Sequence, residues 1–196
     1  GITGSPLSDD AEFLRRVSLD LAGSIPSAET VRNFLADETK VTEKRRALID
    51  RLLTSPQYSR RMQYVFDEML MERRTGSNVP ASDWEAWLRD SLSKNVSWDK
   101  LAAQVLSADG VDLEQRAPAK FYLDRDFDLT LLTRDIGRIF LGVDLECAQC
   151  HDHPNIGSYY QRHFFGINAF LSRSYVFTDP KSKKKMLGEK AEGDVK

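Results

Sequence analysis

Two cysteines and a histidine stand close together in the run Cys147-Ala148-Gln149-Cys150-His151. Two thiols separated by two residues can form thioether bonds to the two vinyl groups of one haem, and CxxCH is the attachment signature of c-type haem. The adjacent imidazole can then bind the haem iron as its proximal ligand. The pattern therefore predicts haem c attached at Cys147 and Cys150, with His151 as the iron ligand.

The sequence leaves the ligand on the distal face of the haem open. His163 follows His151 by twelve residues and can turn over the distal face, whereas His153 is tethered two residues away and is expected to stay on the proximal side. Three methionines are weaker candidates: Met62, Met69 and Met186. An iron with no sixth ligand would favour ligand binding or sensing over electron transfer.

Zinc is the competing interpretation of the same residues, because two thiolates and two imidazoles can hold Zn²⁺ in a tetrahedron. The sequence offers such a set at the spacing C-x2-C-x2-H-x9-H: Cys147, Cys150, His153 and His163. This spacing is not that of a standard zinc finger, and it leaves His151 unused. A cysteine pair without metal, free or joined as a disulfide, is a third possibility. A thioredoxin-like centre is disfavoured because the chain shows no βαβ pattern.

Other catalytic patterns are weak or absent, so the sequence favours an electron-transfer or binding domain over an enzyme. It contains neither a glycine-rich phosphate loop nor a GxSxG motif. Asp124, Asp126 and Asp128 alternate as in a calcium loop, but the glycine and the final glutamate of an EF-hand loop are missing. We interpret these aspartates as capping and turn residues of the helix that follows.

Helices must position the motif, because apolar residues recur at helical spacing through most of the chain. Cap residues predict where six helices begin: Asp9, Ser27, Thr42, Ser55, Ser82 and Ser97. A further helix carries the stripe from Leu129 to Val143 and is expected to run directly into the CxxCH motif. The last helix carries Tyr160 to Leu171. Five large side chains at helical spacing are predicted to be core residues: Met62, Met69, Trp84, Trp87 and Trp98.

The pattern changes after Ser174. Tyr175-Val176-Phe177 and Met186-Leu187 are predicted strands, and the lysine-rich segment between them is an expected exposed turn. The predicted fold is therefore all-α, with about seven or eight helices and a short β appendage near the C-terminus.

Composition narrows the classes of partner. A chain of 196 residues with 41% hydrophobic and 30% charged residues suits a globular domain. The formal net charge of -2 gives no bulk attraction to nucleic acid. The longest apolar stretch, Ile139 to Val143, is too short to span a bilayer. We expect neither nucleic-acid binding nor membrane insertion.

Several blocks of the sequence resemble the planctomycete cytochrome-like domain, a family of uncharacterised function found in large secreted bacterial proteins. The blocks lie at residues 10–17 (DAEFLRRV), 19–21 (LDL), 23–26 (GSIP), 49–53 (IDRLL), 55–58 (SPQY), 140–143 (FLGV), 145–154 (LECAQCHDHP) and 164–166 (FFG). The resemblance covers nearly the whole chain. Two positions depart from the family pattern, which usually has an aromatic residue at Asn155 and an acidic residue at His163.

The resemblance implies that Cys147, Cys150 and His151 hold the haem. It also implies a periplasmic or otherwise extracytoplasmic location in a larger parent protein, with other domains and an unidentified redox protein as partners. We expect residues 1–8 to be a linker or tag remnant, 9–173 the helical cytochrome-like domain, and 174–196 the β appendage or the truncated edge of a larger protein. The expected function is a c-type cytochrome module for electron transfer. The alternative is a structural or interaction module of a large secreted protein, with zinc or no metal at the cysteines and histidines.

Overall fold

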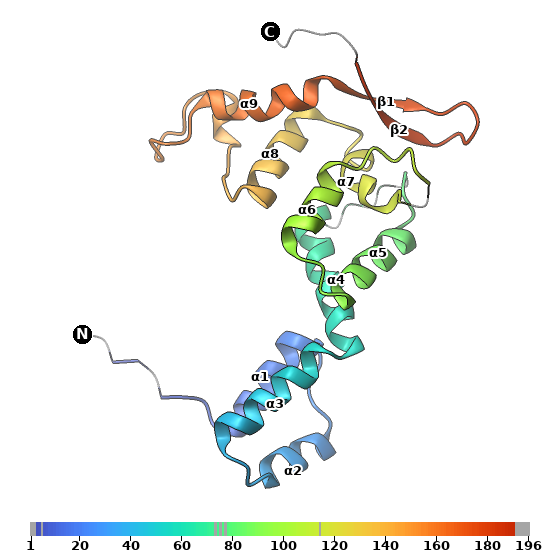
Figure 1. The fold of residues 1–196 in the computed structure, drawn as a ribbon. Helices are drawn as coiled ribbons and strands as arrows, with labels where there is room; N and C mark the ends of the chain where they lie inside the picture. The colour runs from blue at the N-terminus through green and yellow to red at the C-terminus, as the bar shows by residue number, and fades with distance from the viewer. Residues whose placement is uncertain are drawn as a thin grey trace. The chain divides into compact units, whose positions relative to one another are not determined.

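The computed structural model describes residues 3–4, 6–72, 74, 76, 78–113 and 115–190 (Figure 1). The chain divides into two compact units. Unit 1 comprises Gly1–Phe66 and Arg89–Asn95, and unit 2 comprises Asp67–Leu88 and Val96–Lys196. The described residues form nine α-helices and one two-stranded antiparallel sheet near the C-terminus, which confirms the predicted all-α fold with a β appendage.

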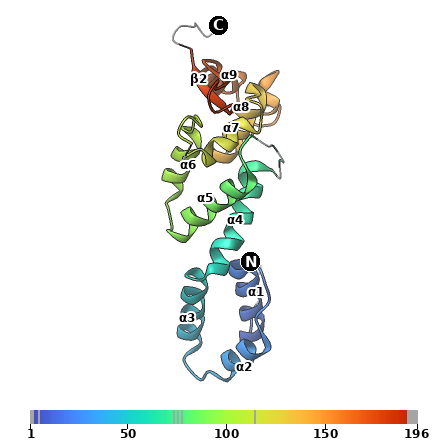
Figure 2. The ribbon, with the colours of Figure 1, turned by 90° about the vertical axis from the view of Figure 1, so that its right-hand side faces the viewer.

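Unit 1 contains three helices that share one apolar core: α1 (Asp10–Ala22), α2 (Ala28–Ala36) and α3 (Val41–Leu53). Figure 2 shows α1 and α3 side by side. Each helix contributes one buried side chain to the centre of this core: Leu14, Phe34 and Leu48. The Asp10 carboxylate ties α1 to α3 through Lys44 Nζ at 2.7 Å and Arg45 Nη2 at 2.8 Å. The core and these ion pairs together hold the three helices in place.

The starts of α1, α2 and α3 follow the predicted caps in two of three cases. Asp9 Oδ1 accepts the Glu12 N–H at 2.7 Å, and Ser27 Oγ accepts the Thr30 N–H at 3.1 Å. The prediction for Thr42 is wrong, because α3 already begins at Val41 and has no side-chain cap.

The boundary between the units falls inside two helices, α4 (Pro56–Met71) and α5 (Ala81–Ser93). The predicted start of α4 is confirmed, since Ser55 Oγ accepts the Tyr58 N–H at 3.2 Å. The predicted capping box at Ser82 is wrong. The Pro80 carbonyl accepts the first helical N–H groups of α5, so that helix begins before Ser82 can cap it.

The predicted core side chains differ in burial. Trp84 is 1% exposed, as predicted for a core residue, whereas Trp98 is 41% exposed. The Trp98 ring stacks on Phe140 with its centroid 5.7 Å away, so it covers a neighbour from outside instead of entering the core. Met62, Met69 and Trp87 are half-buried.

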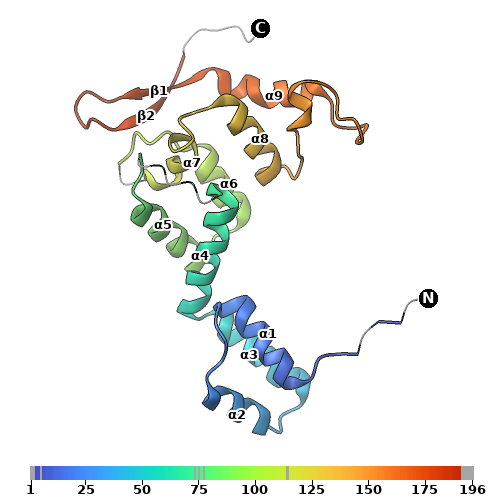
Figure 3. The ribbon, with the colours of Figure 1, turned by 180° about the vertical axis from the view of Figure 1, so that it is seen from behind.

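Unit 2 holds the motif and the sheet. Its elements after α5 are α6 (Trp98–Leu106), the 3-10 helix η1 (Ala117–Ala119), α7 (Lys120–Leu123), α8 (Leu129–Phe140), the 3-10 helix η2 (Cys147–Gln149), α9 (Gln161–Ser172), β1 (Ser174–Thr178) and β2 (Lys185–Glu189). Figure 3 shows α9 on α8, with the strands following α9. The strands pair with Val176 opposite Leu187, which confirms both predicted strands. Among the described residues, no helix has the length and apolar character that a membrane span requires.

A buried ion pair fixes α8 within unit 2. Arg125 Nε donates to Asp135 Oδ2 at 2.8 Å, and both side chains are fully buried. Arg134 reaches the other carboxylate oxygen of Asp135 at 2.7 Å. Burial alone raises the pKa of Asp135, but the hydrogen bonds from Arg134 and Arg125 outweigh burial and hold that pKa below its ordinary value.

A second carboxylate, that of Glu72, lies outside this pair and contacts several arginines. Three partly exposed guanidinium groups contact the Glu72 side chain, those of Arg74 at 2.8 Å, Arg134 at 3.5 Å and Arg138. The backbone of Glu72 is left-handed, with φ 50°. The surface of unit 2 therefore carries three arginines around the carboxylate of Glu72.

Candidate functional site

The chain reaches the CxxCH motif through a reversal and not through a continuous helix, which corrects the sequence prediction. α8 ends at Phe140, and Gly142 adopts a left-handed φ of 66°. Val143 N–H then donates back to Gly137 O at 2.9 Å. A Cβ at Gly137 would lie 3.0 Å from Val143 O, so the absence of a side chain there allows the close approach.

The motif itself forms one helical turn that gathers its three chemical groups. Cys150 N–H and His151 N–H both donate to Cys147 O, at 3.3 and 3.4 Å. Residues three and four apart in such a turn lie on the same side. Cys147, Cys150 and His151 therefore share one face, and both cysteines are free and exposed.

The residue between the cysteines anchors this turn. Ala148 is fully buried and packs with Leu145 and Phe164. Burial of Ala148 on one side forces the flanking thiols to the opposite, open side. In the sequence, Ala148 shows only as one of the two residues that separate the cysteines. Its small apolar side chain inside an otherwise polar motif was the signal for this role.

His151 has the proton arrangement of a metal ligand. Its Nδ1 lies 2.7 Å from Asp152 O, and a carbonyl oxygen can only accept, so Nδ1 carries the proton. Nε2 is left with a free lone pair on an exposed ring. Metal-binding histidines characteristically donate their other ring N–H to a carbonyl or carboxylate in this way.

The other two histidines have the opposite arrangement. His153 Nδ1 accepts the N–H groups of Asn155 and Ile156 at 3.1 and 3.0 Å. His163 Nδ1 accepts the Tyr160 N–H at 3.3 Å, at the start of α9. In both neutral rings Nε2 therefore carries the proton, and neither nitrogen has a lone pair available for a metal.

The structure does not bring the four residues of the zinc interpretation together. In the part of the chain that the structure describes, no three or more cysteine, histidine or acidic side chains are grouped so as to hold a metal ion. The sulfurs of a c-type haem bind vinyl carbons and not the iron, so this finding bears on zinc and leaves the haem geometry untouched. The methionines lie elsewhere: Met62 and Met69 on α4, and the buried Met186 on β2.

Asp152 is a site residue that the sequence interpretation missed. Its carbonyl orients His151, and its Oδ1 accepts the Gln161 N–H at 2.7 Å. Gln161 Nε2 also donates to Gln149 O at 3.3 Å. The first residue of α9 is thus bonded to both sides of the cysteine turn, which fixes the direction of the motif relative to that helix.

The surroundings of the motif suit a group attached at the surface. Ile156 and Phe165, in the segment and helix that follow the motif, are exposed apolar side chains. A cavity of about 160 Å³ lies beside the turn and is lined in part by Arg134, Glu146 and Gln149. The thiols and the imidazole fit the two bonds and the one ligand that haem c needs, on a face that is open and not enclosed.

Comparison with known proteins matches the chain to a protein family. Residues 1–175 match the family model PSCyt2, which is described as "Protein of unknown function (DUF1549)". No curated protein matches the chain. No solved structure matches it either.

Proposed function

The chain belongs to the PSCyt2 family of proteins of unknown function, and we propose that it is a c-type cytochrome module carrying one covalent haem on the turn from Cys147 to His151. The observation that carries the proposal is the common face of the two exposed thiols and the imidazole. The tautomer of His151 supports it independently, because Nε2 is the atom that would bind the iron.

The chain's own residues supply attachment and orientation. Cys147 and Cys150 would hold the haem through two thioether bonds: each S–H would add across one vinyl double bond, the sulfur to one carbon and the hydrogen to the other, so no oxidant or reductant would be consumed. His151 would bind the iron through Nε2, while Asp152 O keeps the proton on Nδ1. The bound haem would supply one-electron chemistry, with a potential tuned by its axial ligands and burial.

The open face favours electron transfer between proteins, because an exposed haem edge lies within reach of a partner. We propose that the module works outside the cytoplasm within a larger exported protein and exchanges electrons with a separate redox protein. His163 could bind the iron only by releasing the Tyr160 N–H or by losing its Nε2 proton. The proposal therefore assigns no distal role to His163 and none to His153.

The test is the pyridine haemochrome spectrum, with intact mass, of the chain made in a host with a c-haem maturation system. We expect a c-type spectrum and the added mass of one haem. The double variant Cys147→Ala/Cys150→Ala should lose the covalent haem. His163→Ala should keep the c-type haemochrome spectrum and should leave the visible absorption bands of the folded protein unchanged. His151→Ala should shift those visible bands.

A haem-free chain, in cells where a control cytochrome matures, would refute the proposal. The better account would then be a structural or interaction module of a large secreted protein, with zinc or no metal at the cysteines. Zinc analysis of that same sample separates the last two cases.

A further inference from the structure

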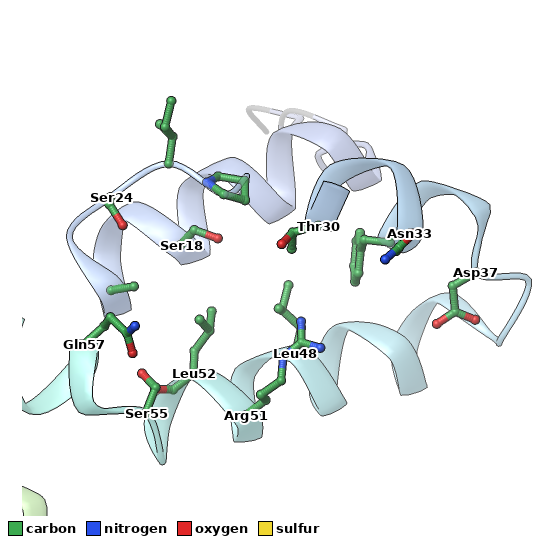
Figure 4. Close-up of a pocket in the computed structure, with 14 residues that line it drawn as sticks. Ser18, Ser24, Thr30, Asn33, Asp37, Leu48, Arg51, Leu52, Ser55 and Gln57 are labelled. Atoms are coloured by element: carbon green, nitrogen blue, oxygen red, sulfur yellow. The ribbon is translucent and has the colours of Figure 1, made fainter. Parts of the chain in front are cut away.

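Unit 1 contains a second candidate site, unrelated to the CxxCH motif. α1, α2, α3 and the first turn of α4 surround a cavity of about 510 Å³ (Figure 4). Pockets that bind small molecules are typically about 300–1,000 Å³ and combine apolar walls with a few convergent polar groups. We propose that this cavity binds a small organic monocarboxylate with an apolar body, either a free acid or the C-terminus of a peptide.

The first support is a set of polar side chains without protein partners. Five side chains of the lining make no hydrogen bond or ion pair within the part of the chain that the structure describes: Ser18, Ser24, Asn33, Arg51 and Gln57. They come from four helices and one connecting loop, so no single turn or cap explains their convergence.

Ser18 is the most telling member of this set. It lies on the inner face of α1 and is only 4% exposed. Ser18 Oγ is not among the buried side-chain atoms that lack a partner in the described residues, so the hydroxyl is reached by solvent through the cavity. Figure 4 shows this hydroxyl directed into the cavity, where a polar group of a ligand can replace water as its hydrogen-bond partner.

The charges of the lining select the class of ligand. Arg51 is the one cation and Asp37 the one anion among the lining residues. Arg51 reaches from α3 into the cavity (Figure 4), and a guanidinium presents a fork of N–H donors that fits a carboxylate. Asp37 would repel a second negative charge on the ligand. A single carboxylate therefore fits this lining better than a phosphate or a dicarboxylate.

The apolar walls select the body of the ligand. Phe34 and Leu48 belong to the buried core of unit 1 and also line the cavity. Ile25, in the loop after α1, also lines the cavity and is 69% exposed. An aliphatic or aromatic group beyond the carboxylate would cover this apolar surface and exclude water from it.

The experiment uses the full chain and NMR titration of its backbone amides. The probes are 4-phenylbutyrate, for a free acid, and the dipeptide acetyl-Leu-Phe with a free carboxylate, for a peptide terminus. The uncharged amide of each probe is its control. We expect saturable shifts at residues that line the cavity, with at least one of the two acids and with neither amide. Which acid binds identifies the source of the carboxylate.

Variants test the roles of the two principal side chains. Arg51→Gln should weaken binding of the acid at least about tenfold, because it removes a charge-assisted hydrogen bond. Arg46→Gln is the matched control, since Arg46 lies on α3, is exposed and does not line the cavity. Ser18→Ala should weaken binding without lowering the unfolding temperature, because its hydroxyl has no partner to lose.

The proposal is overturned if neither acid shifts the lining residues at millimolar concentration. It is also overturned if the amides bind as well as the acids, or if Arg46→Gln weakens binding as much as Arg51→Gln. None of these outcomes depends on haem attachment, so failure here leaves the cytochrome proposal intact.

Discussion

The three histidines of the chain differ in the hydrogen bonds that their Nδ1 atoms make. His151 uses Nδ1 as a donor, while His153 and His163 use Nδ1 as an acceptor. The difference arises from the backbone groups that face each ring, a carbonyl in the first case and N–H groups in the others. A histidine whose Nδ1 accepts backbone N–H groups is held for structure. One whose Nδ1 donates to a carbonyl is free to bind a metal through Nε2.

Loss of Asp135 should strongly destabilise the fold. Asp135→Asn leaves Arg125 fully buried without a counter-charge, and breaking a buried pair in this way costs about 3–5 kcal/mol. Asp126→Asn is the matched control, because Asp126 is exposed and its loss should change stability by less than about 0.5 kcal/mol. Urea unfolding at neutral pH measures both. Equal losses of stability in the two variants would show that the buried ion pair contributes no more than the exposed aspartate.

The same residue sets part of the acid sensitivity. The pKa of Asp135 is below its ordinary value in the folded state, so the stability it contributes is complete above the unfolded pKa of about 3.9. That contribution is lost as the pH falls through the lower pKa of the folded state. The stability difference between the wild-type chain and Asp135→Asn should therefore shrink in acid. A difference that stays constant down to acid unfolding would contradict this.

At the scale of elements, the end of α8 depends on one glycine. Gly142 has a left-handed φ, and its replacement by alanine should cost about 1–2 kcal/mol. Gly166→Ala is the opposite case, because Gly166 lies within α9 with open space around its Cα, and alanine there should stabilise by roughly 0.5–1 kcal/mol. Thermal unfolding of the two variants should give shifts of opposite sign. Shifts of the same sign would mean that the Gly142 turn is not required.

The cysteine turn should be sensitive on its buried side. Ala148→Leu forces extra volume into a filled cluster and should destabilise by about 1–3 kcal/mol. Gln149→Leu, on the exposed side of the same turn, should have little effect on chemical unfolding. If c-haem is attached, Ala148→Leu should also lower the yield of haem-loaded protein. Equal stability of the two variants would show that Ala148 does not anchor the turn.

Most of the helices could be predicted because their signals are local. Asp9, Ser27 and Ser55 cap the helices that their patterns indicated. α7 could not be predicted, since four residues are too few to show a period. The end of α8 was misplaced because Val143 continues the apolar stripe. In the structure Val143 packs in the cluster around Ala148 and is not part of the helix.

The candidate sites were predictable to different degrees. The thiols and His151 are adjacent in sequence, so one turn gathers them whatever the rest of the fold. The tautomers depend on backbone groups that only the folded loop brings to each ring. The cavity of unit 1 needs three helices, the first turn of a fourth and an adjoining loop. Its one sequence signal was Ser18, a polar residue four positions after Leu14 on the apolar stripe of α1.

For the molecule as a whole, alkaline pH should destabilise the fold through Tyr122. Burial raises the pKa of Tyr122 to about 12, and its hydroxyl donates to Leu106 O at 2.9 Å. Because the folded pKa exceeds the unfolded value of about 10, stability is complete below that value and falls as the pH rises toward the folded pKa. Tyrosinate absorbance should show one late step that Tyr122→Phe removes. A titration in which every tyrosine ionises together in the folded protein would contradict this.

The arginines around Glu72 have a further consequence in salt-rich media. Mobile ions screen exposed charges over about 8 Å at physiological ionic strength, but they reach buried pairs far less. Added salt should therefore loosen Arg74 and Arg138 from Glu72, while Arg125 and Arg134 keep their short bonds to the buried Asp135. At high salt the fold should stay the same with a different pattern of surface charge, since the guanidinium groups released from Glu72 become available to dissolved anions.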